Sequence, residues 1–283
     1  YIKLVLAVGA DPIRLSLAGD AADGVLSVND LSDYARFRQV LDGKRRVVIL
    51  GAGLIGCEFA NDLRLGGYEV NVVDLAPQPL GRLLPPQAAG FLRAALETAG
   101  VRFFLGTSVQ TVAHLAQGIA ATLADGTTLE TDLVLSAIGL RPRVDLARAA
   151  GLTVNRGIVT DAVLQSSAKD VYALGDCAEI AGFNLPFVMP IMQAARALAK
   201  TLQGTATPVS YPAMPVVVKT PACPTVVCPP PPGVEGQWEE SVTADGVHAL
   251  FHDSAGTLRG FALVGAATKD KQALTKNIPP LLS

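Results

Sequence analysis

The stretch RRVVILGAGLIGCEFANDLRLGGYEVNVVD, residues 45–74, decides the fold of this chain. The apolar run at 47–50 predicts a β-strand, and the glycine-rich turn GAGLIG follows it at 51–56. Beyond the turn, apolar side chains recur every fourth position, as the inward face of a helix requires, at Ile55, Phe59 and Leu63. Gly66 and Gly67 end that helix, and a second strand closes the stretch. The pattern predicts one β-α-β unit.

The glycines of this turn each meet a physical requirement of phosphate binding. Gly51 permits the tight strand-to-helix turn, Gly53 lets backbone approach a diphosphate with no Cβ in the way, and Gly56 lets helix and strand pack closely. The helix begins near Leu54 and Ile55, where free N–H groups and the positive end of the helix dipole face the phosphates. A lone GxGxxG turn is a weak signal, but its flanking strand and helix favour dinucleotide binding.

Asp74 ends the second strand, eighteen positions after Gly56. A carboxylate at this place can accept hydrogen bonds from both hydroxyls of a ribose, and it repels a 2′-phosphate. We therefore predict NAD(H), rather than NADP(H), as the dinucleotide. The alternative is a solvated carboxylate at a strand end.

Composition limits the remaining classes of function. The chain has 283 residues, of which 50% are hydrophobic and 17% are charged, so it can bury a large core. A formal charge of −2 argues against a nucleic-acid partner, because neutralising phosphates needs a clustered basic excess. No apolar run approaches the ~18 residues of a membrane helix, and no signal peptide opens the chain. We expect a soluble, cytoplasmic protein without a membrane partner.

The cysteines indicate neither a metal site nor a disulfide. Cys57 and Cys177 flank the proposed nucleotide sites, and core packing explains such small thiols better than redox chemistry. Prolines around Cys223 and Cys228 force extended backbone, so the two residues lie roughly 16 Å apart. A disulfide requires Cα atoms within about 4.4 to 6.8 Å of each other.

An internal echo predicts a second dinucleotide-binding domain. AVGADP around Gly9 has the same form as AIGLRP around Gly139, and each follows an apolar strand. Gly139 lies 88 positions (139 − 51) after Gly51. The same offset from Gly9 places a first glycine turn roughly eighty residues before Tyr1. We expect the chain to be truncated at its N-terminus, with the first nucleotide site incomplete.

Three features together resemble the pyridine nucleotide-disulfide oxidoreductase family. They are the β-α-β unit, three short alternating strands before the strand LVLSAIG, the last two joined by Asp125-Gly126, and the segment DVYALGDCAEI at 170–180. The resemblance implies an α/β fold in which an NAD domain is inserted into an FAD domain. It also implies that Gly175 and Asp176 form an FAD motif whose aspartate hydrogen-bonds the flavin ribityl chain. The alternative for Asp176 is a turn aspartate after a strand. A helix opening near Pro190, with Met192, Ala195 and Leu198 packed and Gly204 as its stop, would aim its N-terminus and Val188 at the flavin.

Two motifs of the family that are not found in this sequence narrow the choice of electron acceptor. The family's disulfide reductases carry a CxxxxC pair before the NAD domain and a His-x-x-x-x-Glu pair near the C-terminus, and this chain has neither in place. This favours transfer from flavin to a one-electron partner. The part from YPAMPVVVK onward most closely resembles rubredoxin reductases, which implies rubredoxin, a small iron-sulfur protein, as partner. Basic residues could receive such an acidic carrier or be ordinary solvated surface, namely Arg259, Lys269, Lys271 and Lys276.

Three further residues keep two interpretations each. Lys219, in an apolar run, either stabilises reduced flavin or points outward from a strand. Glu58 lies where the family places an acid near nicotinamide and flavin, or it is a helix N-terminal acid favoured by the dipole. Trp238 is better explained by packing than as part of an electron pathway.

The expected organisation has four segments. Residues 1–43 are a remnant of the FAD domain and a linker, 44–160 the NAD domain, 161–204 the rest of the FAD domain, and 205–283 a small α+β interface domain. The function expected from the resemblance is electron transfer from NADH through FAD to rubredoxin. The alternatives are a related flavin reductase acting on ferredoxin, peroxide or a disulfide, and an NAD-binding module without activity.

Overall fold

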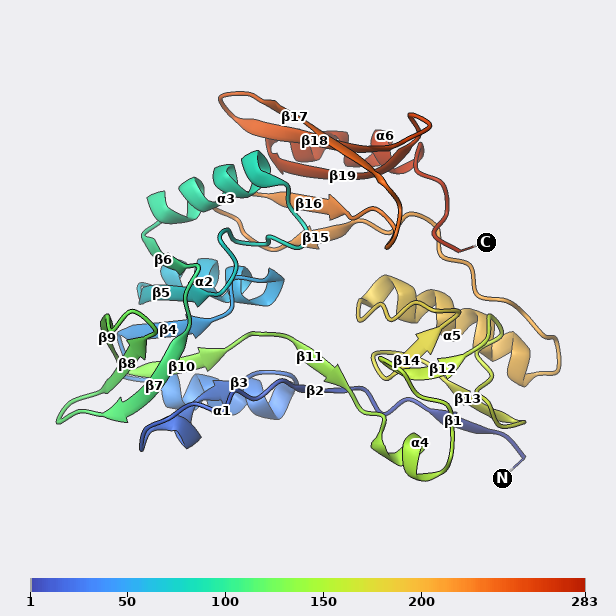
Figure 1. The fold of residues 1–283 in the computed structure, drawn as a ribbon, viewed down its shortest axis with the longest axis horizontal. Coiled ribbons are helices and arrows are strands. Elements are labelled where there is room, and N and C mark those ends of the chain that lie inside the picture. The colour runs from blue at the N-terminus through green and yellow to red at the C-terminus, as the bar shows by residue number, and fades with distance from the viewer. Residues whose placement is uncertain (1, 283) are drawn as a thin grey trace. The chain divides into compact units, whose positions relative to one another are not determined.

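The computed structural model describes residues 2–282 and folds into two compact units. The terminal unit consists of Tyr1–Asp11, Leu140–Met214 and Pro279–Ser283, and the central unit of Pro12–Gly139 and Pro215–Ile278. Figure 1 labels the helices and strands of both. The four predicted segments stay a prediction; in the structure, residues 12–43 share a compact unit with the β-α-β stretch.

The central unit is built on a parallel sheet with strand order β3-β10-β4-β5-β6. The predicted β-α-β unit is confirmed as β4 (Arg46–Leu50), α2 (Leu54–Leu65) and β5 (Glu69–Asp74). The other elements of this layer are η1 (Ala22–Gly24), β3 (Leu26–Ser27), α1 (Leu31–Leu41), α3 (Pro86–Thr98), β6 (Val101–Leu105) and β10 (Leu133–Ser136).

Both faces of this sheet are covered, which explains its continuous apolar strands. Val47 and Ile49 face the core formed with α1, α2 and α3. Val48 and Leu50 point the other way, into a core shared with the predicted three-stranded meander. That meander is antiparallel and consists of β7 (Val109–His114), β8 (Ile119–Leu123) and β9 (Thr128–Thr131).

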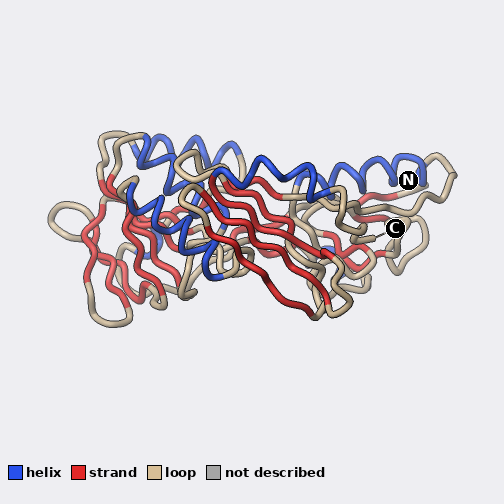
Figure 2. The backbone as a smooth tube through the Cα atoms, turned by 90° about the horizontal axis from the view of Figure 1, so that it is seen from above, coloured by secondary structure: helices blue, strands red, loops and turns tan. Residues whose placement is uncertain are grey.

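A second, antiparallel sheet completes the central unit, with strand order β15-β16-β19-β18-β17. Its long strands run side by side in the middle of Figure 2. One of its faces joins the core of α2 and α3 through Val218, Val247 and Val264. The elements are β15 (Val216–Val218), β16 (Thr225–Cys228), β17 (Gly236–Val242), β18 (Gly246–Asp253), β19 (Leu258–Gly265), η2 (Ala266–Asp270) and α6 (Lys271–Thr275).

The terminal unit holds three two-stranded pairings around its own apolar core. β1 (Leu4–Leu6) pairs with β13 (Val171–Ala173), and β12 (Ile158–Thr160) pairs with β14 (Ala178–Ile180), both in parallel. Its remaining elements are β2 (Ala10–Pro12), β11 (Leu140–Pro142), α4 (Asp145–Ala149) and α5 (Val188–Leu202). The Lys3 ammonium donates to the Leu202 carbonyl at 2.7 Å, at the C-terminal end of α5.

One residue on each of two predicted helix faces is wrong, whereas Leu63 and Leu198 are buried as predicted. Ile55 was expected to face inward on α2, but it is 47% exposed, and the helix buries Gly56, Cys57, Ala60, Asn61 and Leu63 instead. The helix predicted near Pro190 begins at Val188, and Met192 is 44% exposed. In both helices most of the buried residues are small, because small residues permit close approach to the neighbouring elements, and one leucine is buried with them in each. No helix within residues 2–282 has the length and apolar character needed to cross a membrane.

Candidate cofactor sites

The turn between β4 and α2 requires glycine at two of its three positions. Gly51 has φ +104°, and a Cβ on it would lie 2.7 Å from the Ala137 carbonyl oxygen. A Cβ on Gly56 would overlap the carbonyl oxygen of Gly51. Both glycines therefore keep the start of α2 close to the carboxyl ends of β4 and β10.

Gly53 meets a different requirement, because nothing in the described protein occupies the space beside it. Its backbone is extended, with φ −73°, and a Cβ there would have no protein atom within 4 Å. No side chain caps α2 at this end, so the N–H groups of its first turn, from Leu54 onward, stay available. An open cradle beside uncapped N–H groups fits the diphosphate of NAD(H).

Asp74 lies at the edge of this cradle and is partly buried. Its carboxylate accepts hydrogen bonds from the backbone N–H of Ala52 and, at 2.7 Å, from that of Ala76. Asp74, the predicted partner of the ribose, is therefore next to the glycine turn. Its negative charge is stabilised by these two backbone N–H groups.

Side chains from the first turns of α2 also bind the backbone of the segment that joins β15 and β16 of the antiparallel sheet. The Glu58 carboxylate accepts a hydrogen bond from the backbone N–H of Lys219 at 2.9 Å, and Asn61 Oδ1 accepts one from Ala222 at 3.1 Å. Two predicted site residues, Glu58 and Lys219, are thereby brought together across 161 positions. Residue Lys219 is exposed, which agrees with an outward position on the chain after β15.

Sequence reasoning missed Asn61 and Glu240. Asn61 is 1% exposed, and a fully buried amide inside an amphipathic helix was the available signal. The carboxylate of Glu240 on β17 accepts hydrogen bonds from the N–H groups of Gln87 and Ala88, at 3.2 and 2.8 Å. It caps α3 from the other sheet, and nothing in the local sequence of either segment indicates this contact.

The predicted flavin residues lie in the terminal unit. Gly175 has φ +79° and turns the chain after β13, so that Asp176 follows it. Burial raises the pKa of the Asp176 carboxyl above its usual value. Val188, 75% exposed, opens α5, and that helix has no side-chain cap and no acidic residue in its first turn. An uncapped helix N-terminus that ends in exposed apolar side chains fits a flat, partly anionic ring such as flavin.

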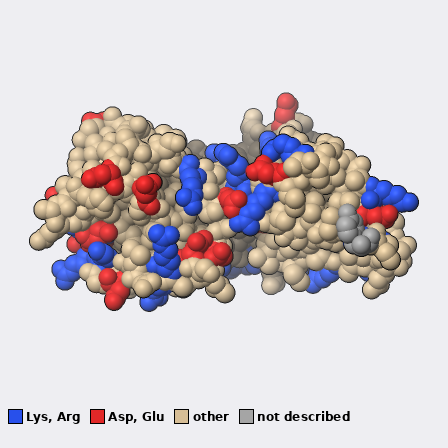
Figure 3. All heavy atoms as spheres, turned by 90° about the horizontal axis from the view of Figure 1, so that it is seen from below, with Lys and Arg blue, Asp and Glu red and all other residues tan. Residues whose placement is uncertain are grey.

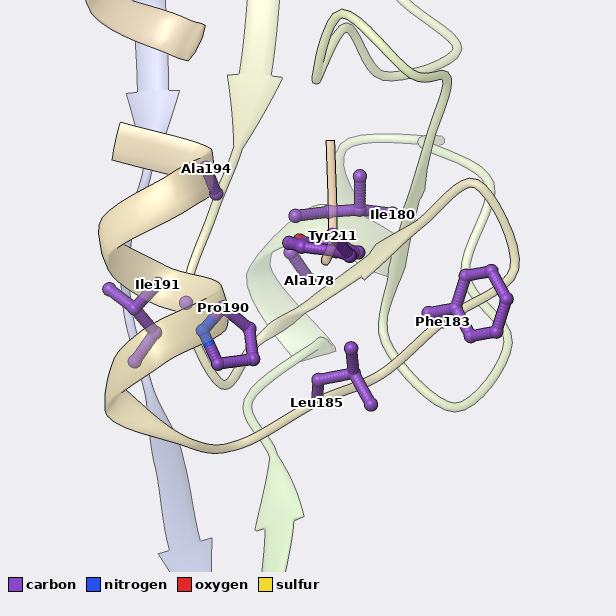
Figure 4. A pocket seen from close by; sticks show the side chains of 9 residues that line it. Ala178, Ile180, Phe183, Leu185, Pro190, Ile191, Ala194 and Tyr211 are labelled. Carbon is purple, nitrogen blue, oxygen red and sulfur yellow. The ribbon is translucent and has the colours of Figure 1, made fainter. Parts of the chain in front are cut away.

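A shallow pocket borders these residues within the same unit. Figure 4 shows the pocket beside the first turns of α5, with Pro190 and Ile191 on the helix and Ile180, Leu185 and Tyr211 also lining it. Gly175 also lines it. Burial raises the pKa of Tyr211 to about 12, so this phenol stays neutral near pH 7. Apart from the Tyr211 phenol its lining side chains carry no polar group, and the pocket lies between the turn at Gly175 and the start of α5.

The two echo glycines both take the left-handed conformation, with φ +72° at Gly9 and +111° at Gly139. Each is followed by a short strand, and these strands, β2 and β11, pair with each other. Their contacts are reciprocal, because Arg143 N–H donates to the Gly9 carbonyl and Ile13 N–H donates to the Gly139 carbonyl, each at 3.0 Å. The two similar segments predicted from the sequence therefore have the same glycine conformation and pair with each other through reciprocal hydrogen bonds.

The four cysteines are buried. Burial raises the pKa of Cys57 to about 12, so its thiolate is absent near neutral pH. Cys223 and Cys228 lie before and at the end of β16 without a disulfide, as predicted. Trp238 is part of β17 rather than a loop, and its ring packs edge-on against Phe251, at 5.4 Å between centroids.

Charges are mixed over the protein surface. Figure 3 shows Lys and Arg interspersed with Asp and Glu on one face. Of the predicted basic residues, Lys269 and Lys276 are exposed, whereas Arg259 is half-buried and lies 3.9 Å from the Asp253 carboxylate. No cluster of potential metal ligands occurs among residues 2–282.

Comparison with known proteins assigns both parts of the chain. Residues 1–203 match the model of the family described as pyridine nucleotide-disulphide oxidoreductase. The chain belongs to this family. Residues 208–278 match a second model, described as a rubredoxin binding C-terminal domain, which covers the antiparallel sheet. The family assignment confirms the predicted α/β fold and the two predicted cofactors, FAD and NAD(H).

Curated relatives agree with both assignments. The rubredoxin-NAD(+) reductase of Acinetobacter baylyi is 54% identical over 100% of this chain and 73% of the relative. That of Alcanivorax borkumensis is 53% identical over 100% of this chain and 74% of the relative. Among solved structures, the ferredoxin reductase for the CYP199A2 system from Rhodopseudomonas palustris superposes with a TM-score of 0.88 at 29% identity, over 99% of this chain and 71% of that one.

Proposed function

We propose that this oxidoreductase passes electrons from NADH through FAD to rubredoxin. The observation that carries the proposal is one compact unit holding both an open, uncapped glycine turn beside Asp74 and the sheet matched by the rubredoxin-binding model. The relatives at 53–54% identity are named for the same reaction. The protein is proposed to work in the cytoplasm.

The NADH site is formed by the turn and the first residues of α2. Gly51 and Gly56 set the shape of the turn, Gly53 leaves room for the diphosphate, and the N–H groups from Leu54 and Ile55 onward bind its charge. The Asp74 carboxylate accepts hydrogen bonds from the hydroxyls of the adenosine ribose, and its negative charge repels a 2′-phosphate. Exposed Ile55 then covers the bound coenzyme rather than the core.

The FAD site is formed by residues of the terminal unit. Gly175 and Asp176 hold the ribityl chain, Val188 and the start of α5 face the pyrimidine edge, and Gly9 shapes the turn before β2. Gly139, the last residue of that segment of the central unit, shapes the corresponding turn before β11. FAD, when bound, supplies the conversion of a two-electron hydride donor into single electrons for an iron-sulfur carrier. The backbone N–H of Lys219 is held by Glu58 within the central unit, and no side chain is proposed to act as acid or base.

The direct test is an anaerobic spectrum of the flavin-loaded protein, followed by NADH and then oxidised rubredoxin. Loss of the flavin band on adding NADH and its rapid return on adding rubredoxin are expected. Loss without return would contradict rubredoxin as acceptor, and ferredoxin, peroxide and a disulfide would then be compared in its place. Failure to retain flavin would favour the NAD-binding module.

The proposed contact between the basic residues and rubredoxin can be tested separately. Lys269 and Lys276 are exposed on the C-terminal part, and charge complementarity would raise the encounter rate with an acidic carrier. The rate of rubredoxin reduction should fall as salt rises. A rate independent of salt would remove these lysines from the docking argument.

A further inference from the structure

Asp74 is tied to the glycine turn in the protein without coenzyme. One of its carboxylate oxygens accepts the N–H of Ala52, which is the middle residue between Gly51 and Gly53. The other accepts a hydrogen bond from the N–H of Ala76 at 2.7 Å. This contact, two residues along the chain, forms an Asx turn that fixes the orientation of the carboxylate. Asp74 therefore links the end of β5 to the turn that begins α2.

Ala52 is held from its carbonyl side as well. Its oxygen accepts the N–H of Leu80 at 2.8 Å and the Cys57 thiol at 3.4 Å, and the residue is 2% exposed. If the Asp74 contact were lost, the buried Ala52 N–H would have no acceptor. An unsatisfied buried donor costs about 1–3 kcal/mol, so the turn would shift to find another partner.

We propose that Asp74 is a positioning residue for the glycine turn, in addition to its role as ribose acceptor. This rests on the proposed NADH site. The two roles use different lone pairs, because a carboxylate can accept about four hydrogen bonds and the backbone takes two of them. The turn is thus ordered before coenzyme arrives, and the diphosphate does not have to order it.

The proposal changes what a coenzyme-specificity substitution does. A neutral residue at position 74 removes the repulsion of a 2′-phosphate, but one without an oxygen acceptor, such as alanine, also releases the N–H of Ala52. Such a variant should bind every diphosphate ligand less well, including ligands with no ribose hydroxyl.

The decisive comparison uses Asp74→Asn and Asp74→Ala, which are both neutral and differ in whether an oxygen acceptor remains. The probe is 2′,3′-dideoxy-ADP, which carries a diphosphate and no ribose hydroxyls. Calorimetry should give Asp74→Ala an affinity about 3- to 10-fold below that of Asp74→Asn, the value of roughly one hydrogen bond. Equal affinities would overturn the positioning role.

A second readout needs no ligand. Amide hydrogen exchange at Ala52 should speed up in Asp74→Ala and stay slow in Asp74→Asn, while Glu69→Ala, at the exposed opposite end of β5, should change nothing there. Unchanged exchange at Ala52 in Asp74→Ala would also overturn the proposal. If the natural protein failed to bind ADP, the NADH site would be refuted, and Ala52 exchange would still decide whether Asp74 positions the turn.

Discussion

Gly53 and Gly56 belong to one turn, yet their substitution should have opposite consequences. At Gly53 a Cβ meets no protein atom, so Gly53→Ala should cost less than about 1 kcal/mol of unfolding free energy, the range of an N-cap change. The same Cβ would stand where the diphosphate must approach. The expected result is an almost unchanged melting temperature with a KM for NADH raised at least about 10-fold, or 1.4 kcal/mol. An unaltered KM would place the diphosphate elsewhere.

Gly56→Ala should damage the fold itself. Its Cβ would overlap the Gly51 carbonyl oxygen, and backbone cannot move away as a flexible side chain can. We expect a loss of about 1–3 kcal/mol in a denaturant titration, as for an overpacked core. Gly90→Ala in α3 is the matched control, because a Cβ at Gly90 would have no atom of a neighbouring element within 4 Å. This substitution should raise the unfolding free energy by about 0.5–1 kcal/mol, since alanine favours the helix over glycine. Equal effects of the two substitutions would contradict the close approach.

Asp132 predicts how stability responds to acid. Hydrogen bonding from the Arg46 guanidinium, 2.8 Å away, lowers the pKa of this carboxyl from 3.8 to about 2, and the backbone N–H groups of Arg45 and Arg46 add to it. A carboxyl with a lowered folded-state pKa stabilises the fold fully above pH ~4 and loses this contribution as pH falls towards 2. After allowance for solvent, the contribution is about 1–2 kcal/mol.

The measurement is the urea midpoint from pH 7 to pH 2 for the natural protein and Asp132→Asn. The difference between them should be constant down to about pH 4 and shrink below it. Glu130→Gln is the control, because Glu130 contacts the same Arg46 at 3.1 Å with a side chain 67% exposed, where an ion pair contributes little. A difference that persists unchanged at pH 2 would show that charge is not its cause.

At the scale of helices and strands, the sequence predicts where α2 and α5 lie better than which faces they bury. Hydrophobic periodicity gives most weight to large side chains, and so it selected Ile55 and Met192. Close packing on a sheet instead selects residues without bulk, such as Gly56 and Ala60 in α2 and Ala194 in α5. The glycine turn was predictable in detail because its requirements are local, involving backbone angles and spacing alone.

The cap on α3 is an element-scale prediction that sequence could not supply. Pro85 at the N-cap offers no acceptor, and Glu240 on β17 supplies both oxygens to Gln87 and Ala88. Glu240→Ala should lower the unfolding free energy by about 1 kcal/mol, as loss of a cap does, and Glu240→Gln by less. Glu239→Ala, whose side chain is 75% exposed, should be nearly neutral in the same thermal melts. A larger loss for Glu239→Ala than for Glu240→Ala would refute the cap.

At the scale of the whole molecule, the long-range contacts were beyond prediction. Glu58 and Asn61 reach Lys219 and Ala222 across 161 positions, and a single sequence carries no signal for which polar pairs meet at such a separation. What they produce is a shared core, in which Val218 and Val264 of the antiparallel sheet pack with the helices of the parallel one. The sheet that the rubredoxin-binding model matches and the glycine turn proposed for NADH thereby belong to one compact unit.

Membership of one compact unit predicts which substitutions respond to coenzyme. Val264→Ala, in the antiparallel sheet, and Val209→Ala, in the terminal unit, remove the same two methyl groups from sites 0% and 1% exposed. Each should cost about 2 kcal/mol. Because the proposed NADH site lies in the central unit, ADP should raise the midpoint of the unfolding transition that Val264→Ala lowers and leave that of Val209→Ala in place. Hydrogen exchange resolved along the chain separates the two transitions, and ADP protection confined to residues 12–139, without 215–278, would show that the antiparallel sheet unfolds independently of the NADH site.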